Sequence, residues 1–420
     1  MSFVPYKITE DEWFWKGPET AYRDSDTTNG ATDTFYPTPI LLHAGNPVMK
    51  RQLKLFEKHY SGSKYKKYIS KVGYNAIELT FSGPVLNRSW LYYLTDACTT
   101  DGNYRASVVF SGETTASIRF TTTRTIAVDS MIGLIGTLDG STTEYTITDN
   151  DVSSGTYVDA TVSPVFPAGA NTKTFTITKH KHVFINTATH VNPPKSFQLL
   201  HYLPNDKSGG VESVYELITG CIVTHYEETA DAESNACEGT WTVLGARIVT
   251  GTVLAPAATY KPVYPAVDYA NFADAALTWT KNSAVVYGMA KGYTFTFKTD
   301  KRLSKGGNSY YPYYAKSPTE VEPSLKITWE AWETDSYDGS QDDPHTALVK
   351  AITLKNARNT LSDYLELAFT TAFQEMAEDP EWVDGNLIES HEFSMSPHEA
   401  GTFTITEMND IDYLRYEAGV

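Results

Sequence analysis

The chain has 420 residues, of which 41% are hydrophobic and 13% aromatic, so it is long enough for two or three domains and can bury a sizeable core. Charged residues are only 20% of the chain, which argues against a disordered protein. The net charge of -17 is opposite in sign to that of a protein that grips nucleic acid by neutralising phosphates. Abundant Tyr, Trp and Thr favour β structure, because such side chains fit a pleated surface.

Residues 1–45 are polar, aromatic and rich in turn formers, which predicts an extended arm. The opening segment has neither the basic start nor the apolar centre of a signal peptide. Asn46-Pro47 has the pattern of a helix start, and apolar residues follow at helical spacing, so we expect a short helix over 47–60. Lysines and tyrosines are interleaved from Lys50 to Lys71; this stretch is a nucleic-acid patch, a solvated helix face with a flexible loop, or a contact for an acidic neighbouring subunit.

Residues 74–82 alternate like a strand, and the next segment, 84–98, predicts a short helix. From 99 to 180 the chain changes character, with short Thr- and Ser-rich runs separated by turn signals such as Asp139-Gly140. This pattern predicts a small all-β, Ig-like domain inserted into a host domain, with the host pattern resuming after residue 182.

The host segment resumes with longer strands. We expect a long antiparallel hairpin over 213–251 that turns near Asp231, and strands at 292–300, 324–334, 387–396 and 401–407. The periodicity between Leu361 and Met376 predicts the main helix of the protein.

Nothing in the chain has the strength of a catalytic motif, so the sequence predicts a protein that is not an enzyme and has no cofactor, no metal site and no catalytic residues. His180 and His182 alternate on a strand and could share one face, but a solvent-facing pair at a domain junction is the simpler interpretation. The three cysteines, Cys98, Cys221 and Cys237, predict reduced thiols, with a Cys221–Cys237 disulfide as the alternative. No apolar run is long enough for a membrane span.

Several segments, taken in order, resemble the major tail tube proteins of long-tailed, siphovirus-like bacterial and archaeal viruses. They are GPVLNRSWLYYLTDAC at 83–98, NPPKSFQLLHYLPND at 192–206, Gly220-Cys221-Ile222-Val223 at the head of the long hairpin, a Pro- and Tyr-rich loop, YTFTFKTDKRL at 293–303, and a late helix after ITWEAW. No short diagnostic motif is involved, and the order of the segments carries the resemblance.

The resemblance implies a mainly β fold, a tail-tube β-sandwich or half-barrel with one main flanking helix. Residues 1–98 would form the arm and the first part of the tube domain, 99–182 an inserted domain on the tube exterior, and 183–420 the rest of the tube domain. It also implies stacked, hexameric rings in the virion tail, assembled in the host cytoplasm. The implied partners are other copies of the chain, the tail terminator, tape measure and baseplate or tip proteins, and viral DNA passing through the bore without sequence-specific binding.

Acidic residues cluster around the hairpin turn: Glu227, Glu228, Asp231, Glu233 and Glu238. Three interpretations are open: these residues line the bore of a tube and keep it negative, they lie at a ring junction and serve assembly, or they are the solvated tip of a hairpin. A different class of function, a secreted or surface β-domain adhesin or carbohydrate-binding protein, remains the alternative to the tail tube. A third, a polysaccharide-acting enzyme on a β scaffold, would need two carboxylates that meet in the fold.

Overall fold

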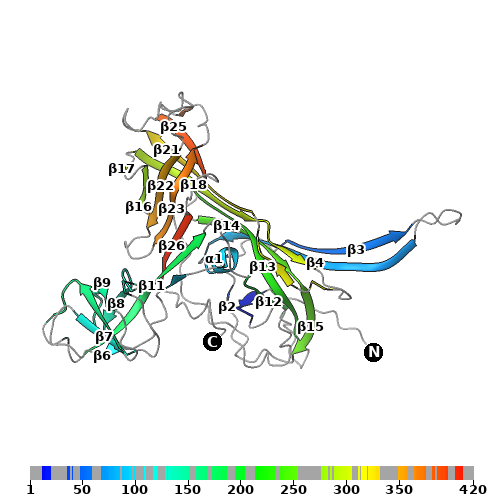
Figure 1. The fold of residues 1–420 in the computed structure, drawn as a ribbon, viewed down its shortest axis with the longest axis horizontal. Helices are drawn as coiled ribbons and strands as arrows, with labels where there is room; N and C mark the ends of the chain where they lie inside the picture. Colours follow the sequence, from blue (N-terminus) through cyan, green and yellow to red (C-terminus); the bar gives the residue numbers. More distant parts are fainter. Residues whose placement is uncertain are drawn as a thin grey trace.

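A computed structural model describes the following parts of the chain: 12–19, 36–37, 40, 48–58, 68–85, 88–96, 99–100, 108–109, 117–121, 128–129, 131–151, 157–167, 170, 173–186, 194–203, 213–231, 237–253, 276–281, 284–285, 288–304, 311–312, 314–318, 320–331, 349–357, 364–374, 381–383, 386–395 and 403–409. These residues are mainly β, as the sequence predicts. All the strand pairs are antiparallel (Figure 1).

A long sheet forms the centre of the molecule. Its strands, in spatial order, are β3 (Val48–Lys58), β4 (Tyr68–Pro84), β14 (Cys237–Gly245), β13 (Ser213–Asp231), β18 (Gly288–Thr299), β21 (Val321–Ala331), β25 (Asn386–Met395) and β24 (Glu381–Val383). We call these eight strands the long sheet. The β3–β4 hairpin projects from one end of it (Figure 1).

The remaining host strands form two further groups. The first contains β1 (Glu12–Lys16), β2 (Tyr36–Pro37), β12 (Phe197–Leu203) and β15 (Arg247–Val253), which pair around the first half of β13. The second contains β16 (Ala276–Lys281), β17 (Ala284–Val285), β22 (Val349–Ala357), β23 (Tyr364–Gln374) and β26 (Phe403–Asn409). A small hairpin, β19 (Arg302–Ser304) with β20 (Tyr314–Lys316), follows β18.

One face of the long sheet is apolar and packs into the core. Side chains that lie side by side on neighbouring strands, such as Phe81 and Trp241 or Phe295 and Leu325, are all buried. The core closes where the second group covers this face, because the Phe403 ring of β26 lies 5.5 Å from that of Phe295. A single apolar cluster therefore runs through the long sheet and both groups.

The described helix, α1 (Leu91–Thr95), lies in the segment where the sequence predicts a short helix, and all five of its residues are buried. The predicted main helix over 361–376 is wrong, because this segment contains strand β23, which pairs with β22 and β26. Leu365 and Phe369 are four residues apart, a spacing that fits a helix and equally fits one face of a strand. Leu367 decides between them: it is buried with the other two, as strand alternation requires.

The predicted helix over 47–60 is also wrong. Val48–Lys58 is strand β3, which pairs with β4 from Val48 opposite Thr80 to Lys58 opposite Tyr68. The expected arm at 1–45 contains a short buried strand, β1, whose Trp13, Phe14 and Trp15 all lie in the interior. The predicted strands at 74–82, 292–300, 324–334, 387–396 and 401–407 correspond to β4, β18, β21, β25 and β26.

Residues between 99 and 186 form β5 (Thr99–Thr100), β6 (Val108–Val109), β7 (Ser117–Thr121), β8 (Ile135–Leu138), β9 (Glu144–Asn150), β10 (Tyr157–Ser163) and β11 (Thr174–Asn186). They have an apolar cluster of their own, between Ile118 and Ile177. The first half of β11 pairs with β8, and its second half pairs with β26 of the host. The assignment of 99–182 as an inserted Ig-like domain stays a prediction.

Candidate functional site: a polar sheet face and a buried ion network

The long sheet has a second face, opposite the core, which carries Thr, Ser and charged side chains. We call it the polar face. Its members on the six strands from β4 to β25 include Thr80, Ser82, Glu227, Thr229, Asp231, Glu238, Thr240, Thr242, Thr294, Thr296, Lys298, Glu322, Ser324, Lys326, Thr328, Ser390, Glu392 and Ser394, all exposed or partly exposed. Six adjacent strands thus share one hydrophilic surface.

Hydroxyl groups on the polar face bond across neighbouring strands. Ser82 Oγ lies 3.1 Å from Thr240 Oγ1, between β4 and β14. Thr328 Oγ1 lies 2.9 Å from Ser390 Oγ, between β21 and β25. Cross-strand hydroxyl pairs of this kind stabilise the sheet on its solvent-facing side.

Three of the five acidic residues that the sequence singles out lie on the polar face. Glu227, Asp231 and Glu238 are exposed there, around the hairpin of β13 and β14. Glu228 does not belong with them: it is 0% exposed and points into the core, because the alternation of β13 turns successive side chains to opposite faces. Glu233 lies outside the described residues.

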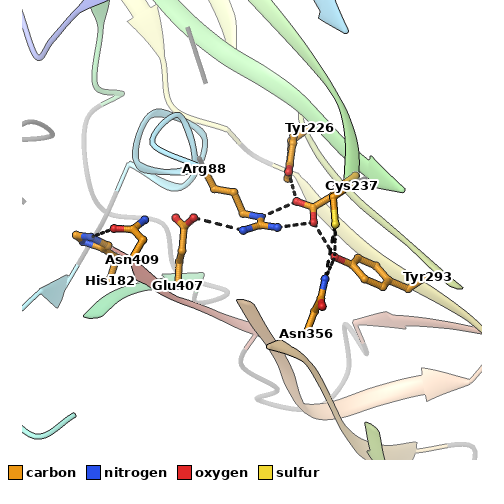
Figure 2. A network of polar contacts seen from close by, with 9 residues as sticks. Arg88, His182, Tyr226, Cys237, Tyr293, Asn356, Glu407 and Asn409 are labelled. Carbon is orange, nitrogen blue, oxygen red and sulfur yellow. Dashed lines mark hydrogen bonds and ion pairs between the residues drawn. The ribbon is translucent and has the colours of Figure 1, made fainter. Parts of the chain in front are cut away.

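Glu228 is the centre of a buried cluster that we call the Arg88 network, with Arg88, Tyr226, Cys237, Tyr293, Asn356 and Glu407 as its other members (Figure 2). Arg88 Nε and Nη2 donate to the two carboxylate oxygens of Glu228 at 2.6 and 2.7 Å. Arg88 Nη1 donates to Glu407 Oε1 at 3.4 Å on the other side. The guanidinium therefore lies between two carboxylates, with the fork geometry that strengthens such pairs.

Two tyrosines complete the coordination of Glu228. The hydroxyl of Tyr226, two residues earlier on β13, donates to one carboxylate oxygen, and that of Tyr293 donates to the other at 2.7 Å. Asn356 Nδ2 donates to the Tyr293 oxygen at 3.1 Å. The carboxylate that β13 buries at Glu228 is thus matched by hydrogen bonds from the turn before α1, from β18 and from β13 itself, as a buried ion pair requires.

The electrostatics follow from burial and from the central guanidinium. Burial disfavours the ionised carboxyl of Glu228, yet the charge and hydrogen bonds of Arg88 outweigh it, so the pKa of Glu228 is lowered. For Glu407 burial wins, and its pKa is raised. Burial also lowers the pKa of Arg88, but Glu228 more than compensates and holds it well above its usual value. The pair is therefore a permanent ion pair at neutral pH.

The two described cysteines are buried thiols and are not bonded to each other. Cys237 lies opposite Ala230 on β13, and Cys221 lies opposite Phe197 on β12, so the hairpin register keeps them apart. On the same hairpin, Val223 is the residue opposite Val243. Burial raises the pKa of Cys237 to about 12, and it raises that of Cys221 well above its usual value. Both thiols are therefore poor nucleophiles.

A second buried ion pair fixes α1. Lys301 Nζ lies 2.6 Å from Asp96 Oδ2, and both side chains are fully buried. The same ammonium donates to the carbonyls of Tyr93 and Leu94 at 2.7 Å, where the helix ends. A cation at a helix C-terminus meets the carbonyls that lack partners, so this lysine ties the end of the helix to the segment that follows β18.

His180 and His182 share one face of β11, as predicted, with ring centroids 6.5 Å apart. They are not solvent-facing, since both are buried, and His182 Nε2 lies 3.1 Å from Asn409 Oδ1. Within the described ranges, no group of three or more His, Cys, Asp or Glu side chains is placed to hold a metal ion.

The sequence analysis did not predict the Arg88 network. The one feature of the sequence that could have indicated it is Arg88 itself, a lone arginine in the apolar segment PVLNRSW.

No helix in the described part of the chain has the length and apolar character needed to cross a bilayer. No protein-family model matches the sequence, and no curated protein matches it either.

Proposed function

We propose that this chain is a structural protein of a viral tail tube, one that assembles with its own copies into stacked rings and does not act as a catalyst. The observation that supports this best is the long sheet, in which one face is core and the other is a hydrophilic surface across six strands. A sheet of this kind can serve as a section of wall, with the polar face toward an aqueous bore.

The ends of the long sheet support assembly. Among the described residues, β3 pairs with β4 alone and β24 pairs with β25 alone, so each terminal strand keeps one edge of backbone groups unpaired within the chain. Unpaired edges are templates for another strand, and joining them around a ring removes the edges altogether. Contacts between rings are heterologous, so stacking extends a tube without limit.

The charge of the polar face fits a DNA conduit. Exposed carboxylates of Glu227, Asp231 and Glu238 lie together around the β13–β14 hairpin. A negative wall repels phosphates, so DNA would pass without being held. The partners would be further copies of the chain, the tail terminator, tape measure and baseplate or tip proteins, and the site of action the virion tail.

Electron microscopy of the purified protein tests the proposal. We expect rings or tubes with a central channel at high protein concentration. A protein that stays monomeric across a wide range of concentration and salt, and also in the presence of preformed tail tips, contradicts it. A glycan-binding signal on a carbohydrate array from the monomer would instead favour the adhesin alternative.

The proposed role of the polar face has its own test. Tubes of a Glu227→Lys/Glu238→Lys variant should retain short duplex DNA in a sedimentation assay, whereas tubes of the unmodified protein should not. The matched control is Glu144→Lys/Asp149→Lys, which makes the same charge change at exposed residues of β9, outside the long sheet. Equal retention by both variants would show that net charge alone matters and that the polar face does not line the bore.

A further inference from the structure

The strands of the host form two sets with the same pairing pattern. The first set is β1, β2, β3, β4, β12, β13, β14 and β15. The second set is β16, β17, β18, β21, β22, then β23 and β24 together as the sixth member, then β25 and β26. In each set the first strand pairs with the second and with the fifth, as β1 does with β2 and β12 and β16 with β17 and β22. In each set the third and fourth strands form a hairpin, β3–β4 and β18–β21.

The rest of the pattern repeats too. The fourth strand pairs with the seventh, as β4 does with β14 and β21 with β25. The sixth strand is divided between two layers: its first part pairs with the fifth and eighth strands, and its second part pairs with the seventh. In the first set β13 spans both parts, and in the second set β23 and β24 share them.

The two sets also run in the same direction and bury the same face. Adjacent strands of the long sheet are antiparallel, so β18 runs parallel in space to β3, four strands away. The fourth strands have closely similar buried triplets, Ile77, Leu79 and Phe81 in β4 and Leu325, Ile327 and Trp329 in β21. Both sets place a hydroxyl pair between their fourth and seventh strands on the polar face.

We propose that the chain is a tandem duplication of one tube-forming repeat, and that a ring of the tube therefore contains three chains, which supply six repeats, and not six chains. The first repeat is Glu12–Val253 without the segment between α1 and β12, and the second is Ala276–Asn409. This inference rests on the proposed function. It replaces the expectation of a hexamer by a trimer with six equivalent positions.

The junction between the repeats shows how two chains would join. Within the chain, β13 of the first repeat pairs with β18 of the second, antiparallel from His225 opposite Lys298 to Asp231 opposite Gly292. Among the described residues, the equivalent strands that stay open are β24 and β3, because the end of β23 pairs with β22 on one side and with β25 on the other. A second copy of the chain would therefore place its β3 edge, antiparallel, beside β24, repeating the same junction. Each chain offers one open strand of each kind, so chains join head to tail, and the assembly is a ring where the rotation between successive chains closes after three of them.

The width of the bore favours three chains. Eight strands from each of three chains, spaced about 4.8 Å apart and tilted by about 40° to the axis, make a wall about 150 Å around and about 48 Å across. Side chains that reach about 5 Å inward from each side leave a bore of about 38 Å, which admits one DNA double helix. Six chains would leave a bore of about 86 Å, far wider than a single duplex needs.

Disulfide trapping in assembled protein tests the ring size. Glu381 of β24 lies opposite Ile388 of β25, and Gln52 of β3 lies opposite Ala76 of β4. With the buried triplets of β4 and β21 superposed, these two positions correspond to Glu227 and Thr296, which lie opposite each other at the β13–β18 junction. We expect a Glu381→Cys/Gln52→Cys variant, oxidised as rings, to give a covalent ladder that ends at three chains on a denaturing gel. Variants with either cysteine alone should give no ladder, and mass measurement of intact rings should give three chains per ring.

The outcomes separate this inference from the proposed function. A ladder that continues to six chains, or sixfold rings by mass, overturns the duplication as the basis of ring size and leaves the tube intact. Rings of three chains without cross-links overturn the β3–β24 junction. A protein that forms no rings under any condition overturns the proposed function itself.

Discussion

At the residue scale, the Arg88 network is where single substitutions should matter most. Arg88→Met removes the cation that neutralises Glu228 and Glu407, both of which lie in the core. A carboxylate left buried without its partner is strongly unfavourable, so we expect the free energy of unfolding to fall by about 3–5 kcal/mol, measured by urea denaturation.

The matched control for Arg88→Met is Arg119→Met. Arg119 makes an equally short bidentate pair with Asp159, at 2.6 Å, but its side chain is 40% exposed, so water replaces the lost partner. The control should therefore unfold at nearly the urea concentration of the unmodified protein. Equal losses in the two variants would show that burial of the Arg88 network contributes nothing.

The same network makes stability depend on acid. Because the pKa of Glu228 is lowered in the folded protein, the unfolded chain holds this proton more tightly. The stabilisation is complete above the ordinary glutamate pKa of about 4.3 and is lost as the pH falls through the folded value. Urea titrations between pH 7 and pH 3 should show this loss in the unmodified protein and a weaker one in Glu228→Gln. Parallel curves for the two proteins would contradict it.

Glu228 also shows what residue-level reading of the sequence could and could not find. Composition located the acidic hairpin, and Glu227, Asp231 and Glu238 do lie on the surface there. Strand alternation alone places Glu228 on the face opposite to Glu227, but nothing nearby in the sequence shows what would neutralise a carboxylate in the core. The bonds that hold it come from Arg88, Tyr293 and Tyr226, two of them far away in sequence. Ion pairs over such separations leave no local pattern.

At the element scale, β23 gives the clearest test of strand against helix. On a strand Leu367 faces the core with Leu365 and Phe369, while on a helix it would point away from them. Leu367→Ala should therefore lower the free energy of unfolding by about 2–5 kcal/mol. Glu366→Ala, one residue earlier and only partly buried, is the control and should have a small effect. The reverse order of the two effects would restore the helix.

The errors at β3 and β23 have one physical cause. Apolar residues four apart fit both periods, and the pairing partner that decides between them is not local. For β23 the partners are β22 and β26, and β26 begins about thirty residues away. Strands with strict alternation, such as β21 with Leu325, Ile327 and Trp329, could be predicted from the sequence because helical spacing does not fit them.

At the scale of the whole molecule, the two apolar clusters should respond separately to substitution. Ile147 belongs to the cluster between Ile118 and Ile177, and Leu354 belongs to the main one, both fully buried. Ile147→Ala should lower the protection of β8 to β10 amides against hydrogen exchange and leave the long sheet unchanged. Leu354→Ala should do the opposite. Loss of protection throughout the chain in both variants would show a single cooperative unit.

The mainly β architecture could be predicted from composition and alternation, and so could the hairpin of β13 and β14. The repeated pairing pattern could not. Its two halves differ in loop lengths and in side chains, and β13 of the first corresponds to two strands, β23 and β24, of the second. Equivalence of this kind lies in which strands are neighbours, and neighbours become known only in the fold.

One consequence concerns the outside of the assembly. The segment from β5 to β11 is joined to the first repeat, between α1 and β12, and the second repeat has no described counterpart between β21 and β22. In a ring of three chains every alternate position would then carry this segment. The proposed tube would then carry three longitudinal or helical rows of this segment around a wall of six units, so its exterior would have threefold symmetry although its wall has six similar units.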